Sequence, residues 1–140
     1  MMLLNKAGAP EWEKYFGGNL KESLRRVRFD PCGRPELLFL TLSVLATTDG
    51  VAIPAPQPSS QAVASILAKL DPKDGRLLWA KGVAPGGNTD INGINQYDFG
   101  IELNGQSRVV GDFRGAVDLG GGQPASAVGG SHPYLIVYNP

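Results

Sequence analysis

Apolar and polar residues alternate over several short stretches of this 140-residue chain, which is the pattern of strands that bury one face. Residues 99–103 and 107–113 both alternate in this way and flank the pair Asn104-Gly105. Asn and Gly tolerate the positive φ angles that the two-residue turn of a β-hairpin requires. The pattern therefore predicts a hairpin with strands over these two ranges.

Residues 65–71 and 133–139 each form a short, largely apolar run and predict one strand apiece. The first run is followed by the turn residues 72–75, and residues 76–83 predict the next strand. The run at 133–139 is apolar at odd and even positions alike. We expect both of its faces to be buried, as in a sheet stacked between two others.

One segment fits two interpretations. Residues 19–27 place Leu20, Leu24 and Val27 at helical spacing, whereas residues 25–30 alternate as a strand does. The sequence leaves helix and strand open here.

Similar residues recur about 67 positions apart along the chain. The first Trp motif, Trp12-x-Lys14, matches Trp79-x-Lys81, and residues 66–72 align with residues 134–140. The recurrence predicts one repeat-built domain over 1–140, with a half unit at 1–18, a full unit at 19–85 and a partial unit at 86–140. Since both ends fall inside a unit, we expect a fragment of a longer array.

Composition favours the same fold class. Nineteen Gly and eleven Pro in so short a chain disfavour long helices and favour many tight turns. We therefore predict an all-β protein with two degenerate four-stranded antiparallel repeats.

Residues 64–140 resemble a known family. The residues that carry the likeness are Leu70-Asp71-x-x-x-Gly75-x-x-x-Trp79-x-Lys81, then Phe99-x-Ile101-x-Leu103-Asn104-Gly105, and then Gly111-x-Phe113-x-Gly115-x-Val117-Asp118. This pattern resembles the bacterial β-propeller repeats (SBBP-like repeats) of secreted and cell-envelope proteins. In the first copy, residues 30–35 replace the Asn-Gly turn, so the resemblance there depends on spacing and Trp12.

The resemblance implies blade-like repeats that belong to a propeller or to an open propeller-like stack. A propeller has about four to eight blades, so two units require further repeats or an oligomer to complete a ring. The implied function is a non-catalytic structural or binding module at the extracellular side or cell envelope of bacteria, with a protein or glycan partner. The alternative is part of a propeller enzyme whose site lies in the central channel.

Charge and cysteine content narrow the partners. Thirteen Lys and Arg balance thirteen Asp and Glu, so no long-range field attracts nucleic acid or an anionic membrane. The longest apolar run, residues 37–45, is too short to span a bilayer, and the first residues do not form a secretory signal. Cys32 is the only cysteine, which excludes an internal disulfide and leaves the redox compartment unreadable.

One loop carries a candidate metal site. Asp90, Asn92 and Asp98 place oxygen ligands at the first, third and ninth positions of a segment, as in a short calcium loop. Ile94 stands where such a loop normally supplies another oxygen, so a plain polar turn is the competing interpretation. Calcium is the one cofactor that the sequence raises.

No catalytic or cofactor-binding set is predicted. His132 is the only histidine and lacks a recognisable partner motif, and the glycines at 120–122 precede Pro124 rather than a helix that could hold phosphate. Trp12, Trp79 and the aromatic residues of 133–139 could stack on a sugar, but their repeated positions favour core packing.

Overall fold

The computed structural model describes residues 2–17, 22–41, 45–47, 52–53, 64–86, 93–118 and 124–139. All regular structure within these ranges is β-strand, and none of it is a helix that could cross a membrane. The strands are β1 (Met2–Leu4), β2 (Pro10–Glu13), β3 (Phe16–Gly17), β4 (Glu22–Phe29), β5 (Pro35–Thr41), β6 (Leu45–Thr47), β7 (Ala52–Ile53), β8 (Ala64–Leu70), β9 (Leu77–Gly86), β10 (Gly93–Ile101), β11 (Ser107–Asp118) and β12 (Pro124–Tyr138).

The strands form three antiparallel sheets. A two-stranded sheet holds β1 and β2, and a three-stranded sheet has the order β3-β6-β7. The largest sheet has the order β10-β11-β9-β8-β5-β4, with β12 paired to the other edge of β11. None of the sheets formed by the described strands closes on itself. The all-β antiparallel prediction is confirmed.

The hairpin predicted around Asn104-Gly105 is present and joins β10 to β11. Gly105 has a φ of 85°, and its amide donates to the carbonyl of Glu102 across the turn. β10 ends at Ile101, and Leu103 lies in the turn with its side chain exposed, whereas the alternation had placed Leu103 in the strand. The turn needs two more residues than the sequence pattern indicated.

The ambiguous segment forms a strand. β4 pairs with β5 along its whole length, and the register shifts between Leu24 and Arg26 at an irregularity of the bulge type. β5 is almost entirely buried, so pairing with it satisfies the backbone of β4 at the edge of a core. This tertiary contact outweighs the helical spacing of the apolar residues.

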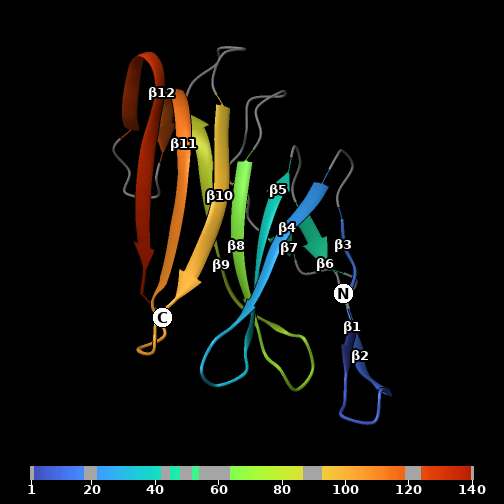
Figure 1. Ribbon diagram of the computed structural model, residues 1–140. Coiled ribbons are helices and arrows are strands. Elements are labelled where there is room, and N and C mark those ends of the chain that lie inside the picture. The colour runs from blue at the N-terminus through green and yellow to red at the C-terminus, as the bar shows by residue number, and fades with distance from the viewer. Residues whose placement is uncertain are drawn as a thin grey trace.

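The largest sheet curls into two layers that face each other (Figure 1). One layer comprises β4, β5, β8 and most of β9, and the other comprises β10, β11 and β12. Between them lies a core cluster of Leu38 and Leu67 from the first layer with aromatic and branched residues of the second. Those residues of the second layer are Phe99, Val109, Phe113, Val117 and Tyr134.

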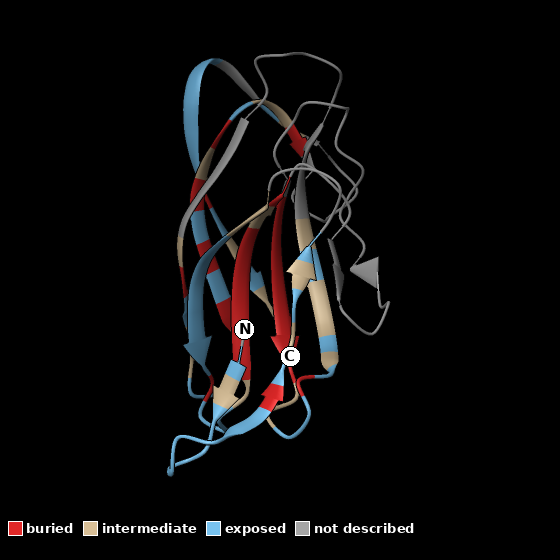
Figure 2. Cartoon of the chain, turned by 90° about the vertical axis from the view of Figure 1, so that its right-hand side faces the viewer, coloured by how far each residue is buried: buried red, intermediate tan, exposed pale blue. Residues whose placement is uncertain are grey.

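The first layer is buried on its other face as well. There the side chains of Leu37, Phe39, Ile66, Ala68 and Leu70 form a second cluster with Trp12 of the β1-β2 hairpin. Both central strands, β5 and β8, are therefore buried on both sides, as the continuous red ribbons of Figure 2 show. Strands buried on both faces are expected to read as nearly continuous apolar runs, and β5 does.

The second layer differs from the expectation for residues 133–139. Tyr134 lies in the core between the layers, with Ile136 and Tyr138 packed against it, but Leu135 and Val137 are exposed. The prediction that both faces of this strand are buried is wrong for the structure. No described segment covers the side to which Leu135 and Val137 point.

The pairing registers of the two layers correspond. Val27 pairs with Leu37 in β4-β5, and Phe99 pairs with Val109 in β10-β11, 72 positions later in both strands. The irregularity between Leu24 and Arg26 has its counterpart between Gln96 and Asp98, at the same displacement.

The next pair of strands continues the correspondence. In β5-β8, Leu38 pairs with Leu67, and in β11-β12, Val110 pairs with Leu135. The Trp strands match too, because Leu3 pairs with Trp12 as Lys69 pairs with Trp79, with a register shift directly after Leu3 and after Lys69.

Candidate functional site

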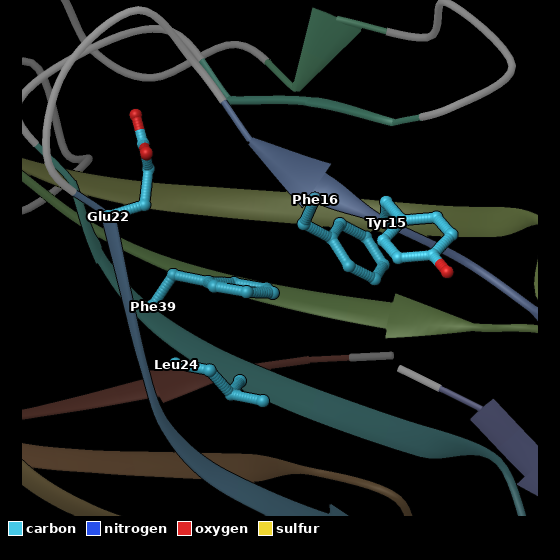
Figure 3. A pocket seen from close by; sticks show the side chains of 5 residues that line it. All are labelled: Tyr15, Phe16, Glu22, Leu24 and Phe39. Atoms are coloured by element: carbon cyan, nitrogen blue, oxygen red, sulfur yellow. The ribbon is translucent and has the colours of Figure 1, made fainter.

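A shallow pocket of about 210 Å³ opens between β3, β4 and β5 (Figure 3). Its lining comprises Tyr15, Phe16, Glu22, Leu24 and Phe39. The Phe16 and Phe39 rings pack with centroids 5.1 Å apart and tilted by 43°, which forms an aromatic floor. A volume below the usual range of about 300–1,000 Å³ for small-molecule sites suits a single apolar side chain.

The rim of this pocket is polar on one side. The Tyr15 hydroxyl donates a hydrogen bond to Glu13 Oε1 at 2.5 Å. This bond, together with the negative charge of Glu13, raises the pKa of Tyr15. The ring of Tyr15 is itself exposed, so the pocket combines an aromatic wall with a neutral phenol. Such a lining can hold an apolar group by contact.

A cluster of buried charges lies at the turn between β4 and β5. Lys69 Nζ is 2.8 Å from Asp30 Oδ2 and 2.9 Å from Glu36 Oε1, and all three side chains are almost fully buried. Arg34 Nε donates to Asp30 Oδ2 at 2.7 Å. Ser107 of β11 donates to Glu36 Oε2 at 2.6 Å. The cluster therefore ties the two layers together.

The protonation states of this cluster follow from its geometry. Burial opposes ionisation of Asp30, but hydrogen bonds from Lys69 and Arg34 outweigh it and lower the pKa of Asp30 to about 2. Burial likewise opposes the charge on Lys69, yet its bonds to Asp30 and Glu36 raise the pKa of that ammonium group. The ion pairs and hydrogen bonds of these groups join the β4-β5 turn, β5, β8 and β11.

The calcium candidates are only partly within the described residues. Asp90 and Asn92 lie outside them. Asp98 lies in β10, where its two carboxylate oxygens accept hydrogen bonds from Arg28 of β4 at 2.9 and 2.7 Å. The bond to Arg28 lowers the pKa of Asp98 against the opposing effect of burial, and Arg26 Nε lies 3.6 Å from the same carboxylate. A calcium ion at Asp98 would have to displace Arg28.

The aromatic residues weighed as a sugar groove lie in or against the cores. Trp12 is buried, and its Nε1 donates to the carbonyl of Pro72 at 2.8 Å, while Trp79 packs against the cluster between the layers. Burial raises the pKa of Tyr138 to about 12. These positions agree with the prediction of core packing.

The remaining sequence candidates do not gather into a site. His132 lies in β12, where its ring packs near Phe113 with a centroid separation of 6.1 Å, and the glycines at 120–122 lie outside the described residues. Cys32 is a free, exposed thiol in the β4-β5 turn. Within the part of the chain that the structure describes, no three His, Cys, Asp or Glu side chains come together as a metal site.

An exposed apolar surface is the feature that the sequence did not indicate. It consists of Val110 on β11 with Leu135 and Val137 on β12, which are 41%, 58% and 44% exposed, and we call it the outer face. Apolar side chains grouped on one side of a sheet are typical of a contact with protein. The sequence carries no signal for this surface, because whether apolar side chains are covered depends on which strands lie over them.

Comparison with known proteins adds no relative. No family model, no curated protein and no solved structure matches this chain.

Proposed function

We propose that this chain is a non-catalytic structural module in which equivalent β units stack face to face and present apolar faces to protein. The observation that carries the proposal is the shared register of the two layers, including the irregularity before Arg26 and before Asp98. A repeated backbone frame with a core between successive sheets is the organisation of stacked repeat proteins.

The unit of this stack is a four-stranded antiparallel meander, β4-β5-β8-β9, and β10-β11-β12 correspond to its first three strands. The β1-β2 hairpin corresponds to the end of the third strand and to the fourth. On this interpretation the chain is part of a propeller-like or open stack at the bacterial cell envelope, as its likeness to SBBP-like repeats implies. The buried charge cluster supports a structural role, because each of its members is consumed in joining strands.

Paired substitutions at corresponding positions test this function. In a stack, the face that carries Leu67 is covered by the next unit, whereas Leu135 occupies the same position in a unit whose face is free. We expect Leu67→Ala to lower the free energy of unfolding by about 2–5 kcal/mol. The matched Leu135→Ala should change it by less than about 0.5 kcal/mol.

The measurement is urea denaturation followed by circular dichroism, in dilute solution so that association does not contribute. Equal effects of the two substitutions would refute the stacked arrangement, because the two positions would then have the same surroundings.

A further inference from the structure

The outer face has a covered counterpart in the same molecule. By strand pairing, Val110 and Leu135 correspond to Leu38 and Leu67, and Val137 corresponds to Lys69. The first-layer residues are almost fully buried, because β10, β11 and β12 cover them. The outer face thus corresponds in register to the surface of the first layer that the second layer covers.

A second exposed apolar surface lies on β4. It consists of Leu24, Val27 and Phe29, which are 46%, 40% and 55% exposed, and we call it the β4 face. Val27 corresponds to Phe99, which is buried under the first layer. The β4 face thus corresponds in register to the surface of the second layer that packs against the first. The aromatic pocket adjoins this face, because Leu24 belongs to both.

The charges beside the two faces are of opposite sign. Inside the molecule, Arg26 and Arg28 of the first layer pair with Asp98 of the second. Arg26 and Asp98 occupy corresponding positions in the two layers. When the outer face of one molecule meets the β4 face of another, Asp98 of the first therefore approaches Arg26 of the second, and opposite charges again face each other.

The free edge of β12 completes the match. In the first layer the corresponding edge of β8 pairs with β9, with Lys69 opposite Trp79. In the second layer no described strand pairs with that edge of β12. β2 carries Trp12 at the position of Trp79, and its one described partner is the three-residue strand β1.

We propose that a second copy of this chain binds head to tail, with its outer face on the β4 face of the first copy and its β12 beside β2 in place of β1. Val137 of one copy then lies opposite Trp12 of the other, where Leu3 lies in the single chain. An exposed strand edge is a ready template for such pairing. The contact joins two different surfaces, so it leads to rings or open chains rather than two-fold dimers. This inference rests on the proposed stacking function.

Sedimentation velocity over a concentration series tests the proposal. The wild-type chain is expected to exceed its monomer mass of 14.8 kDa as concentration rises. Leu135→Asp and Val27→Asp each block one of the two faces, so each variant alone should remain a monomer, with apparent affinity reduced at least about tenfold. Leu103→Asp, at an exposed turn position outside both faces, is the matched control and should assemble as the wild type does.

Mixing the two blocked variants distinguishes head-to-tail association from other modes of association. Leu135→Asp keeps an intact β4 face and Val27→Asp keeps an intact outer face, so an equimolar mixture should form dimers and nothing larger. Hydrogen exchange should show amides of residues 134–138 gaining protection and those of Met2–Leu4 losing it. If circular dichroism shows that Leu135→Asp is unfolded, Val137→Lys replaces it, because Lys69 occupies the corresponding position in the folded first layer.

Three results would overturn the proposal: a wild-type monomer at every concentration, assembly that survives Leu135→Asp, or a mixture of the variants that stays monomeric. Each of these three results is compatible with a strong effect of Leu67→Ala on the free energy of unfolding. Failure of self-association therefore does not by itself refute the proposed stacking of units within one chain. Equal effects of Leu67→Ala and Leu135→Ala would remove the basis of both.

Discussion

At the scale of single residues, the position of Lys69 in the fold determines which ionic partners it requires. Its ammonium group is buried between Asp30 and Glu36 and lies 6.0 Å from the centre of the Trp79 ring. A buried ion pair contributes little to stability by itself, but removing one partner leaves an uncompensated charge. The corresponding position in the second layer is Val137, an uncharged and partly exposed side chain that requires no ionic partner.

The acid side of the stability curve tests this cluster. The pKa of Asp30 falls from 3.8 to about 2 on folding, so the contribution of its carboxylate is complete above the ordinary carboxyl range and is lost as pH falls through about 2. We expect a loss of about 2 kcal/mol between pH 5 and pH 2 from this group. Chemical denaturation at each pH measures it.

The Lys69→Met variant is the control for this assignment. Without the ammonium group, Asp30 and Glu36 remain buried with less compensation, and the variant is expected to be less stable at neutral pH by about 3–5 kcal/mol. Its stability should then fall less steeply towards acid pH. An acid limb that is unchanged in Lys69→Met would contradict the role of Lys69.

At the scale of elements, the β1-β2 hairpin is held on the first layer through the turn between β8 and β9. Trp12 donates a hydrogen bond to the carbonyl of Pro72 in that turn. Gly75 of the same turn has a φ of 70°, and a Cβ added to it would lie 2.8 Å from the Trp12 ring. Both its backbone conformation and its surroundings therefore require glycine.

Substitution of Gly75 tests this attachment. Gly75→Ala should destabilise the chain by more than the roughly 1 kcal/mol expected for strain at a positive φ, because the indole of Trp12 must also move. Gly33→Ala is the matched control, since Gly33 has a φ of 76° with open space around it. Thermal melting with Trp fluorescence gives both effects. Equal losses in the two variants would show that the Trp12 contact carries no weight.

Local pattern was enough to predict some elements. Alternation and the Asn104-Gly105 pair located the β10-β11 hairpin, and the spacing of Trp12 and Trp79 gave two strands that have matching partners in the structure. The local sequence pattern could not show that residues 22–29 form a strand, because that outcome depends on pairing with β5. Local pattern indicates which side chains are apolar, and tertiary arrangement decides which of them are covered.

The candidate surfaces were beyond sequence reasoning for the same reason. Leu135 and Leu67 are alike in sequence context, yet one is exposed and the other buried, because among the described residues only the first layer is covered on that side. The pocket lined by Tyr15 and Phe39 brings together residues far apart in the chain. The pairing of Asp98 with Arg28 joins β10 to β4, which no motif spacing encodes.

At the scale of the whole molecule, two layers with corresponding pairing registers share one core, and exposed apolar side chains lie on the outer face and on the β4 face. The core between the layers contains Leu38 and Leu67 from one layer and Phe99 and Val109 from the other. In the proposed assembly, each copy contacts the next in the same way as the first layer contacts the second. Leu67 lies in the core between the layers, and Leu135 lies on the outer face. The neighbours of these two leucines therefore distinguish the covered surface from the exposed one.

Methyl nuclear Overhauser spectroscopy on the monomeric Val27→Asp variant tests this central claim most directly. The Leu67 methyl groups are expected to show cross-peaks to Val109 and to the Phe99 ring, because these residues share the core between the layers. The Leu135 methyl groups should show none to either residue, because they point away from that core. Absence of the Leu67 cross-peaks, or their appearance at Leu135 instead, would contradict the face-to-face arrangement of the two layers.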